Sequence, residues 1–362
     1  SRWISQEAAR LAPYTPGEQP QDQQYVKLNT NESPFPPSPK VLKAINRAEI
    51  LKLNLYSDPT CAALTEAIAR RYELKAKNVL AGNGSDEVLA FAFRAFCGAG
   101  QPVAFADVTY GFYKSQAALF DLDVKIIPLR EDFTLHVDDY MDFPGTIVIA
   151  NPNAPTGLAL PRGAIEGILK ANPNNVVIVD EAYVDFGAES CVPMIYRYDN
   201  LLVTQTMSKS RSLAGGRVGY ALGSPELIAD LNRVKYSFHP YNVNRLSIAA
   251  GGRRCGGRGV LRRLHRCHPA DPGLDRGRAG EFGLHCPALP GQLRLCPPQP
   301  ASRRDPVPEA EGERRPGPLV RRGPDPGLYP HYHRIHGADG DPGGGADGHP
   351  GRAVRRRRDA HC

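Results

Sequence analysis

The sequence predicts an α/β fold with a mostly parallel sheet. Short apolar runs alternate with helical stretches through residues 79–235, a pattern typical of a parallel sheet covered by helices on both faces. Several of these runs end in polar or glycine-rich segments, and ligands of such folds bind at strand ends. With 362 residues, 41% of them hydrophobic, the chain is long enough for one large domain and a smaller one.

Composition divides the chain near Gly251. Beyond that residue there is no Lys, Asn, Thr, Met or Trp, and five of the eight cysteines lie among many Arg, Gly and Pro residues. We therefore expect an N-terminal arm over 1–40, a large domain over 41–250, and a low-complexity Arg/Gly/Pro-rich tail over 251–362. The basic charge balance is mostly a property of this tail.

Three explanations of the tail compete. It is a natural disordered basic segment, a Cys/His module around Cys255, His265, Cys267 and His268, or the product of a shifted reading frame. Such a composition cannot bury enough apolar surface to offset chain entropy. We favour the frame shift, because Arg, Gly, Pro, Ala, His and Cys are what a GC-rich gene encodes out of frame. The small domain is then absent or disordered.

Partners and location follow from the same composition. No apolar run approaches the length of a membrane helix, and the first residues contain no apolar signal core. We therefore expect a cytoplasmic protein with no membrane partner. A non-catalytic protein that binds nucleic acid through its basic tail is the alternative from another class. It is not favoured, because the tail has few aromatic residues and the ordered motifs below would be unexplained.

In chain order, the arm is rich in Pro and turn residues, which deny it regular structure. A helix is predicted over 62–72, with apolar residues on one face. Residues 79–89 indicate a strand, a glycine-rich turn and a helix that Ser85 can cap. This is an ordinary capped helix, or a phosphate site made by free N–H groups and the helix dipole.

Further apolar runs over 103–105, 124–127 and 146–150 predict buried strands. The third run leads into a proline-rich turn, Asn-Pro-Asn-Ala-Pro-Thr-Gly over 151–157. A fourth run ends in Asp180, and a buried carboxylate is costly unless it has a partner. That partner is a structural cation or a bound ligand.

Ser208, Lys209 and Arg217 follow the next predicted strand, at 201–203. A single Lys after a strand is usually a solvated surface residue. Here Ser208 and Arg217 can both bind one phosphate, and a lysine held beside a phosphate suits a Schiff base to an aldehyde cofactor.

The segment Ser-Lys-x-x-x-Leu-Ala-Gly-x-Arg-x-Gly-Tyr at 208–220, together with Asp180-x-x-Tyr183, resembles fold-type I pyridoxal-phosphate (PLP) aminotransferases, especially the histidinol-phosphate aminotransferases. The resemblance covers about residues 1–250. It implies the PLP-dependent transferase fold type I large domain, with PLP as cofactor. It also implies that Lys209 forms the Schiff base and moves the proton, that Asp180 pairs with the pyridine nitrogen, and that Tyr183 bonds the phenolic oxygen.

The resemblance implies further roles in binding PLP. Asn153 is assigned to the phenolic oxygen, although Ala154 stands where the family carries Asn and the register of this loop is open. Tyr110 is expected to stack on the ring. Tyr56 is expected to reach the phosphate bound by a partner subunit, which predicts a homodimer. The phosphate is otherwise assigned to the side chains and helix start formed by Ser85, Asp86, Ser208 and Arg217.

Substrate specificity depends on the arm. Tyr14 and Asn31 lie in segments similar to the arm that closes over substrate in histidinol-phosphate aminotransferases. The expected reaction is transamination between histidinol phosphate and 2-oxoglutarate, impaired if the small domain is lost. An aromatic-amino-acid aminotransferase or a phosphothreonine-type decarboxylase stays open, because the cofactor residues do not discriminate between substrates.

Overall fold

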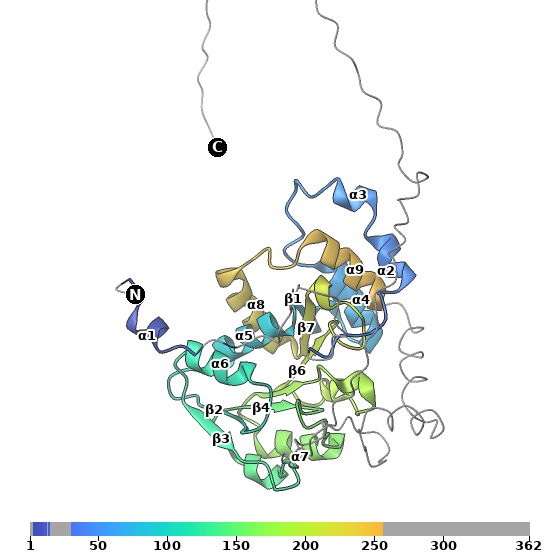
Figure 1. Cartoon of the computed structure of the whole chain (residues 1–362). Coiled ribbons are helices and arrows are strands. Elements are labelled where there is room, and N and C mark those ends of the chain that lie inside the picture. The colour runs from blue at the N-terminus through green and yellow to red at the C-terminus, as the bar shows by residue number, and fades with distance from the viewer. Residues whose placement is uncertain (1–2, 13, 15–29, 256–362) are drawn as a thin grey trace, which may run out of the picture. The chain divides into compact units, whose positions relative to one another are not determined.

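The computed structural model describes residues 3–12, 14 and 30–255. They fall within one compact unit and are the coloured part of the chain in Figure 1. The tail that the composition marks out lies outside the described residues, apart from its first five positions.

Seven strands form a sheet in the described part of the chain, in the order β1-β7-β6-β5-β4-β2-β3. The strands are β1 (Val79–Asn83), β2 (Val103–Ala106), β3 (Val124–Ile127), β4 (Thr146–Ala150), β5 (Val177–Asp180), β6 (Leu201–Thr206) and β7 (Val218–Gly223). β6, β5, β4, β2 and β3 pair in parallel, whereas β7 pairs antiparallel with both β6 and β1. The mostly parallel sheet is confirmed, and β7 is a strand that the sequence analysis did not predict.

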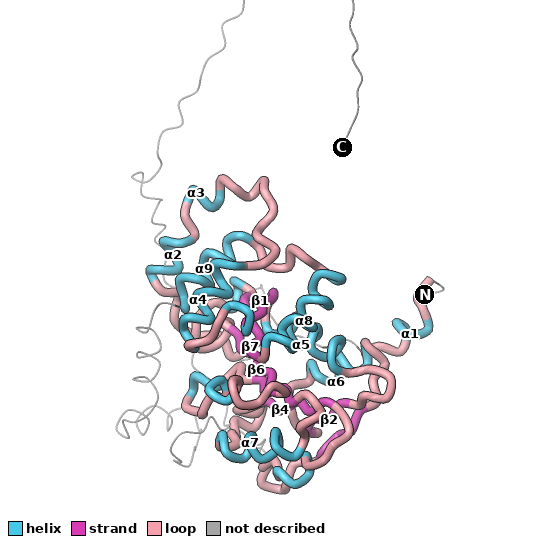
Figure 2. Tube along the Cα trace, turned by 180° about the vertical axis from the view of Figure 1, so that it is seen from behind, coloured by secondary structure: helices cyan, strands magenta, loops and turns pink. Residues whose placement is uncertain are grey.

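Helices cover both faces of the sheet (Figures 1 and 2). Apolar residues of α4, α7 and α9 pack with alternate strand residues in one cluster, and those of α5, α6 and α8 pack on the opposite face. The α-helices are α1 (Gln6–Ala9), α2 (Pro39–Ala44), α3 (Arg47–Ile50), α4 (Ala62–Tyr72), α5 (Ser85–Phe96), α6 (Phe112–Leu119), α7 (Arg162–Ala171), α8 (Pro225–Phe238) and α9 (Arg245–Cys255). The helix predicted over 62–72 is therefore confirmed as α4.

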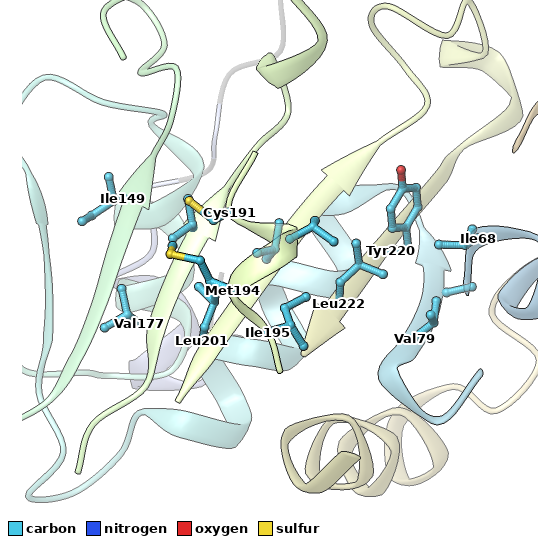
Figure 3. Packing of buried hydrophobic residues seen from close by; sticks show 14 of the residues in the cluster. Ile68, Val79, Ile149, Val177, Cys191, Met194, Ile195, Leu201, Tyr220 and Leu222 are labelled. Carbon is cyan, nitrogen blue, oxygen red and sulfur yellow. The ribbon is translucent and has the colours of Figure 1, made fainter. Parts of the chain in front are cut away.

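The alternate directions of side chains along each strand explain why both faces of the sheet are covered. Ile147 and Ile149 of β4 lie in the cluster with α4, whereas Val148 lies in the cluster with α5, because successive side chains of a strand point to opposite faces. Figure 3 shows part of the first cluster, including Ile68 of α4 and Leu201 of β6. Burial on both faces is why these strands read as continuous apolar runs.

One edge of the sheet collects the loops that carry the predicted site. The parallel strands β4, β5 and β6 end there, and β1 has the same direction as β6 because two antiparallel pairings separate them. The amino end of α5, which follows β1 directly, therefore faces the loops after β5 and β6. This arrangement places the glycine-rich turn, the Asp180 loop and the Lys209 loop at one edge.

Candidate functional site

Lys209 lies in the loop after β6 and faces the loop after β5. Its Nζ is 5.6 Å from the centroid of the Tyr183 ring, and it donates a hydrogen bond of 2.8 Å to the carbonyl oxygen of Thr30. The structure thus brings the predicted amine and the predicted phenol together beneath a segment of the N-terminal arm. Both side chains come from loops at strand ends, where an α/β sheet binds ligands.

Asp180 is the last residue of β5 and is 4% exposed. Its carboxylate accepts hydrogen bonds from Tyr113 Oη at 2.7 Å, from Thr204 Oγ1 at 3.2 Å and from the Ala182 N–H at 3.2 Å. Burial outweighs these bonds and raises the pKa of Asp180 to about 6. These neutral donors hold the carboxylate in place, and a cation bound nearby would stabilise its charge.

The sequence analysis missed Tyr113 and Thr204. Tyr113 lies in α6, one helical turn after Tyr110, and Thr204 lies opposite Asp180 in the pairing of β5 with β6. Tyr113 carried only a weak signal, because a tyrosine hydroxyl usually finds a hydrogen-bond partner once it is buried. Thr204 carried none, because its contact depends on strand register.

Arg217 lies against the amino end of α5. Its Nη2 is 3.0 Å from Asp86 Oδ2, and its Nη1 donates to Ser208 Oγ at 3.4 Å. These contacts bring together three of the residues that were predicted to bind the phosphate. The predicted cap is wrong, because Ser85 is the first residue of α5 and the N-cap position is Gly84, with φ of 86° and no side-chain cap. The amides at the helix start are therefore not capped by a side chain, which suits anion binding.

Tyr110 and Tyr14 lie beside this group. The Tyr110 hydroxyl donates to Asp86 Oδ1 at 3.0 Å, and burial together with the Asp86 charge raises the pKa of Tyr110. The Tyr14 ring meets the Tyr110 ring edge-on, with 6.0 Å between centroids. The predicted stacking and substrate residues are thus neighbours.

The two asparagines of the prediction differ in their surroundings. Asn31 Nδ2 donates to the Tyr183 hydroxyl at 3.0 Å, which joins the arm to the site. Asn153 instead forms hydrogen bonds with the loop after β2. Its Nδ2 donates to the Val108 carbonyl at 2.9 Å, and its Oδ1 accepts from Thr109 Oγ1 at 2.8 Å. The polar atoms of Asn153 are therefore occupied within the loop.

Tyr56 is 80% exposed and stacks on Tyr241, with 4.6 Å between ring centroids. A single chain thus leaves this side chain at the surface, and its use in a partner subunit stays a prediction.

The comparisons with known proteins agree with this geometry. Residues 23–247 match the family model for aminotransferase class I and II. The chain belongs to this family. It is 56% identical over 250 residues to a histidinol-phosphate aminotransferase of Marinomonas, and 52% identical over 248 residues to that of Clostridium acetobutylicum. Each alignment covers 68% of this chain and 70% of the relative.

A solved relative of this aminotransferase extends the comparison to structure. The histidinol-phosphate aminotransferase of Sinorhizobium meliloti, in complex with pyridoxal-5'-phosphate, superposes with a TM-score of 0.59 at 25% identity. The superposition covers 65% of each chain, so it spans less than two thirds of that protein. In the described residues, no helix has the length and apolar character to span a membrane.

The residues of this aminotransferase fit PLP. Lys209 supplies an amine for the aldehyde, and Asp180 supplies a buried carboxylate that accepts hydrogen bonds from neutral donors and whose pKa is raised by burial. Arg217, Ser208 and the uncapped start of α5 supply donors for a phosphate. Asp86 is the one group of this cluster that opposes an anion, so a phosphate would have to share Arg217 with it.

Proposed function

We propose that this aminotransferase is PLP-dependent and transfers an amino group from histidinol phosphate to 2-oxoglutarate. The observation that carries the proposal is the approach of Lys209 Nζ to the Tyr183 ring in the loop that follows the buried Asp180. The names of the relatives at 51–56% identity support the choice of amino donor.

PLP supplies an aldehyde that bonds to amines and a conjugated ring that accepts the electron pair left when a proton leaves the substrate α-carbon. Lys209 would supply the amine for that aldehyde, and its Nζ would act as the general base and acid for the substrate proton. Asp180 would face the ring nitrogen and keep a proton on it, because a cation would stabilise this buried carboxylate. Tyr183 is assigned to the phenolic oxygen, and Asn153 keeps a weaker assignment because its amide is already bonded.

The remaining residues bind and orient. Ser85, Asp86, Ser208 and Arg217 form the phosphate end of the site, and Arg217 makes the strongest contribution there because its planar fork can bond two oxygens. Tyr110 offers a flat face for the ring.

Tyr14 and Asn31 would meet the substrate. Both come from the arm, and they contact Tyr110 and Tyr183 respectively. A substrate panel tests the assignment: the purified chain, with PLP added, receives histidinol phosphate, phenylalanine or phosphothreonine with 2-oxoglutarate. Formation of glutamate with histidinol phosphate is expected. Turnover of phenylalanine alone, or release of CO₂ from phosphothreonine, would favour the alternatives.

The proposal includes a homodimer in which Tyr56 reaches the partner's cofactor phosphate. Apolar residues that precede Tyr56 are strongly exposed, with Leu51 at 68%, Leu53 at 54% and Leu55 at 58%. Three exposed leucines in one short segment support an interaction surface there. Sedimentation velocity tests the dimer, and a monomer at working concentration would contradict it.

The tail affects how fast the chain turns over, not which reaction is proposed for it. We propose that residues 251–362 replace a small domain and that this chain turns over slowly as a result, in a cytoplasmic setting. Translation of the other frames of the source DNA downstream of Ala250 tests the frame shift. If neither frame restores an α/β domain, the explanation is wrong. Nucleic-acid binding that falls steeply with salt and is lost on removal of the tail would favour the alternative class.

A further inference from the structure

A buried polar network lies behind the Lys209 loop. Its centre is Arg211, which is 5% exposed although it is charged. Arg211 Nε donates to Asp185 Oδ2 at 3.1 Å, and the Ser210 hydroxyl donates to the same oxygen. The loop after β6 is thereby tied to the short helical turn that follows β5.

The two terminal nitrogens of the Arg211 guanidinium extend the network to side chains of α4, β6 and β7. Its Nη2 donates to Tyr72 Oη at 2.8 Å and to Gln205 Oε1 at 3.0 Å, and its Nη1 donates to the Tyr220 hydroxyl. Tyr220 also belongs to the apolar core of Figure 3. The guanidinium is therefore held on several sides by groups that are themselves packed.

Gln205 closes the connection between the two loops. Its Nε2 donates to Glu181 Oε2 at 2.7 Å, and Glu181 is the residue directly after Asp180. The loop after β5 is thus held by hydrogen bonds at Glu181 and at Asp185, on either side of Tyr183. The loop after β6 is held by hydrogen bonds at Ser210 and Arg211, directly after Lys209.

The surroundings of the ion pair at the centre favour the charged form of both partners. Burial raises the pKa of Asp185, but Arg211 and Ser210 outweigh it and hold that pKa below its ordinary value. Burial lowers the pKa of Arg211, but Tyr220, Tyr72 and Asp185 outweigh it and hold that pKa above its ordinary value. Removal of either partner would leave an uncompensated buried charge.

We propose that Asp185 and Arg211 are positioning residues, which set the distance between Lys209 Nζ and the Tyr183 side of the site. They act through the backbone, because each lies within two residues of the group that it positions. The expected effect on PLP attachment rests on the proposed function. The positioning itself rests on the contacts that Asp185 and Arg211 make. A misplacement of about 1 Å in a reacting group can cost about 100-fold in rate.

The test uses the full chain and the variants Asp185→Asn, Arg211→Lys and their double variant. Excess PLP is added, portions are reduced with borohydride at intervals, and mass spectrometry follows the pyridoxyl group on Lys209. Each single variant is expected to slow this attachment by about 10- to 100-fold. The double variant is expected to be no slower than the slower single variant, because both changes break one unit.

A matched control separates positioning from loss of stability. Asn172 is 1% exposed and bonds the backbone of Tyr140 and Phe143, at the opposite edge of the sheet. Asn172→Ala should lower the thermal midpoint and leave the attachment rate unchanged. Ser210→Ala keeps both charges and serves as a milder variant, with a smaller slowing expected. Attachment as fast in the Asp185 and Arg211 variants as in the wild type, or equal slowing in the control, would overturn the inference.

Amide hydrogen exchange on the cofactor-free chain tests the same coupling without PLP. Asp185→Asn should raise exchange in residues 181–187 and also in 206–213, whereas Asn172→Ala should raise it in neither. A rise confined to 181–187 would overturn the inference. If Asp185→Asn raises exchange in both segments but the wild type fails to attach PLP at Lys209, the proposed function fails and the positioning contact stands.

Discussion

Replacement of Asp180 by Asn should change how the stability of the cofactor-free protein depends on pH. Asp180 is 4% exposed, and its burial raises the pKa of the carboxyl group to about 6 from its ordinary value of 3.8. The folded state therefore binds this proton more tightly than the unfolded chain does. The asparagine variant has no such proton.

The sign and the size follow from linkage. Because the folded pKa lies above the unfolded pKa, the free energy of unfolding of the wild type falls as pH rises from about 4 to about 6. It then stays constant above the folded pKa. A shift of about two pKa units corresponds to about 3 kcal/mol. Glu181, whose burial raises its pKa to about 7, contributes a similar slope to both proteins and cancels in the difference.

Urea unfolding of both cofactor-free proteins between pH 4 and pH 7.5 measures this difference. We expect the variant to gain about 3 kcal/mol relative to the wild type across that range. We also expect added PLP to reduce the slope of the wild type, because a cation beside Asp180 lowers its pKa. Parallel curves for the two proteins would refute the reasoning that burial dominates at Asp180.

Three further predictions concern the phosphate end, the core and the dimer. Arg217→Ala should weaken PLP binding by about 1.5–3 kcal/mol, measured by fluorescence titration, and should hardly affect pyridoxal, which lacks the phosphate. Ile68→Ala should lower the free energy of unfolding by about 2–5 kcal/mol, because Ile68 is 0% exposed; a loss below 1 kcal/mol in urea would contradict the packing. Tyr56→Ala should weaken PLP binding in mixed dimers only at the site that lacks the partner's tyrosine.

The sequence predicted the parts of the fold that depend on local pattern. The continuous apolar runs became β2, β4, β5 and β6, because burial on both faces leaves its mark in every residue of a strand. β7 was missed because its residues, 218–223, contain two glycines and overlap the Lys209 motif. Its antiparallel pairing on both sides depends on tertiary contacts that no local pattern records.

The candidate site shows the same division. Lys209, Asp180 and Arg217 could be found from their chemistry and spacing, and the structure brings them to one edge of the sheet. The partners of Asp180 come from α6 and β6, so they could not be found without the fold. Arg211 was overlooked although it lies within the motif, because nothing in the local sequence indicates that a charged residue is buried.

Covalent attachment of PLP shows whether Lys209 is the amine that binds the cofactor. The full chain and its Lys209→Ala variant are incubated with PLP, reduced with borohydride, digested and examined by mass spectrometry. The account predicts a pyridoxyl group on Lys209 of the wild type and none at that site in the variant, with both proteins equally folded by circular dichroism. Attachment spread over surface lysines, with Lys209 unmodified, would contradict it.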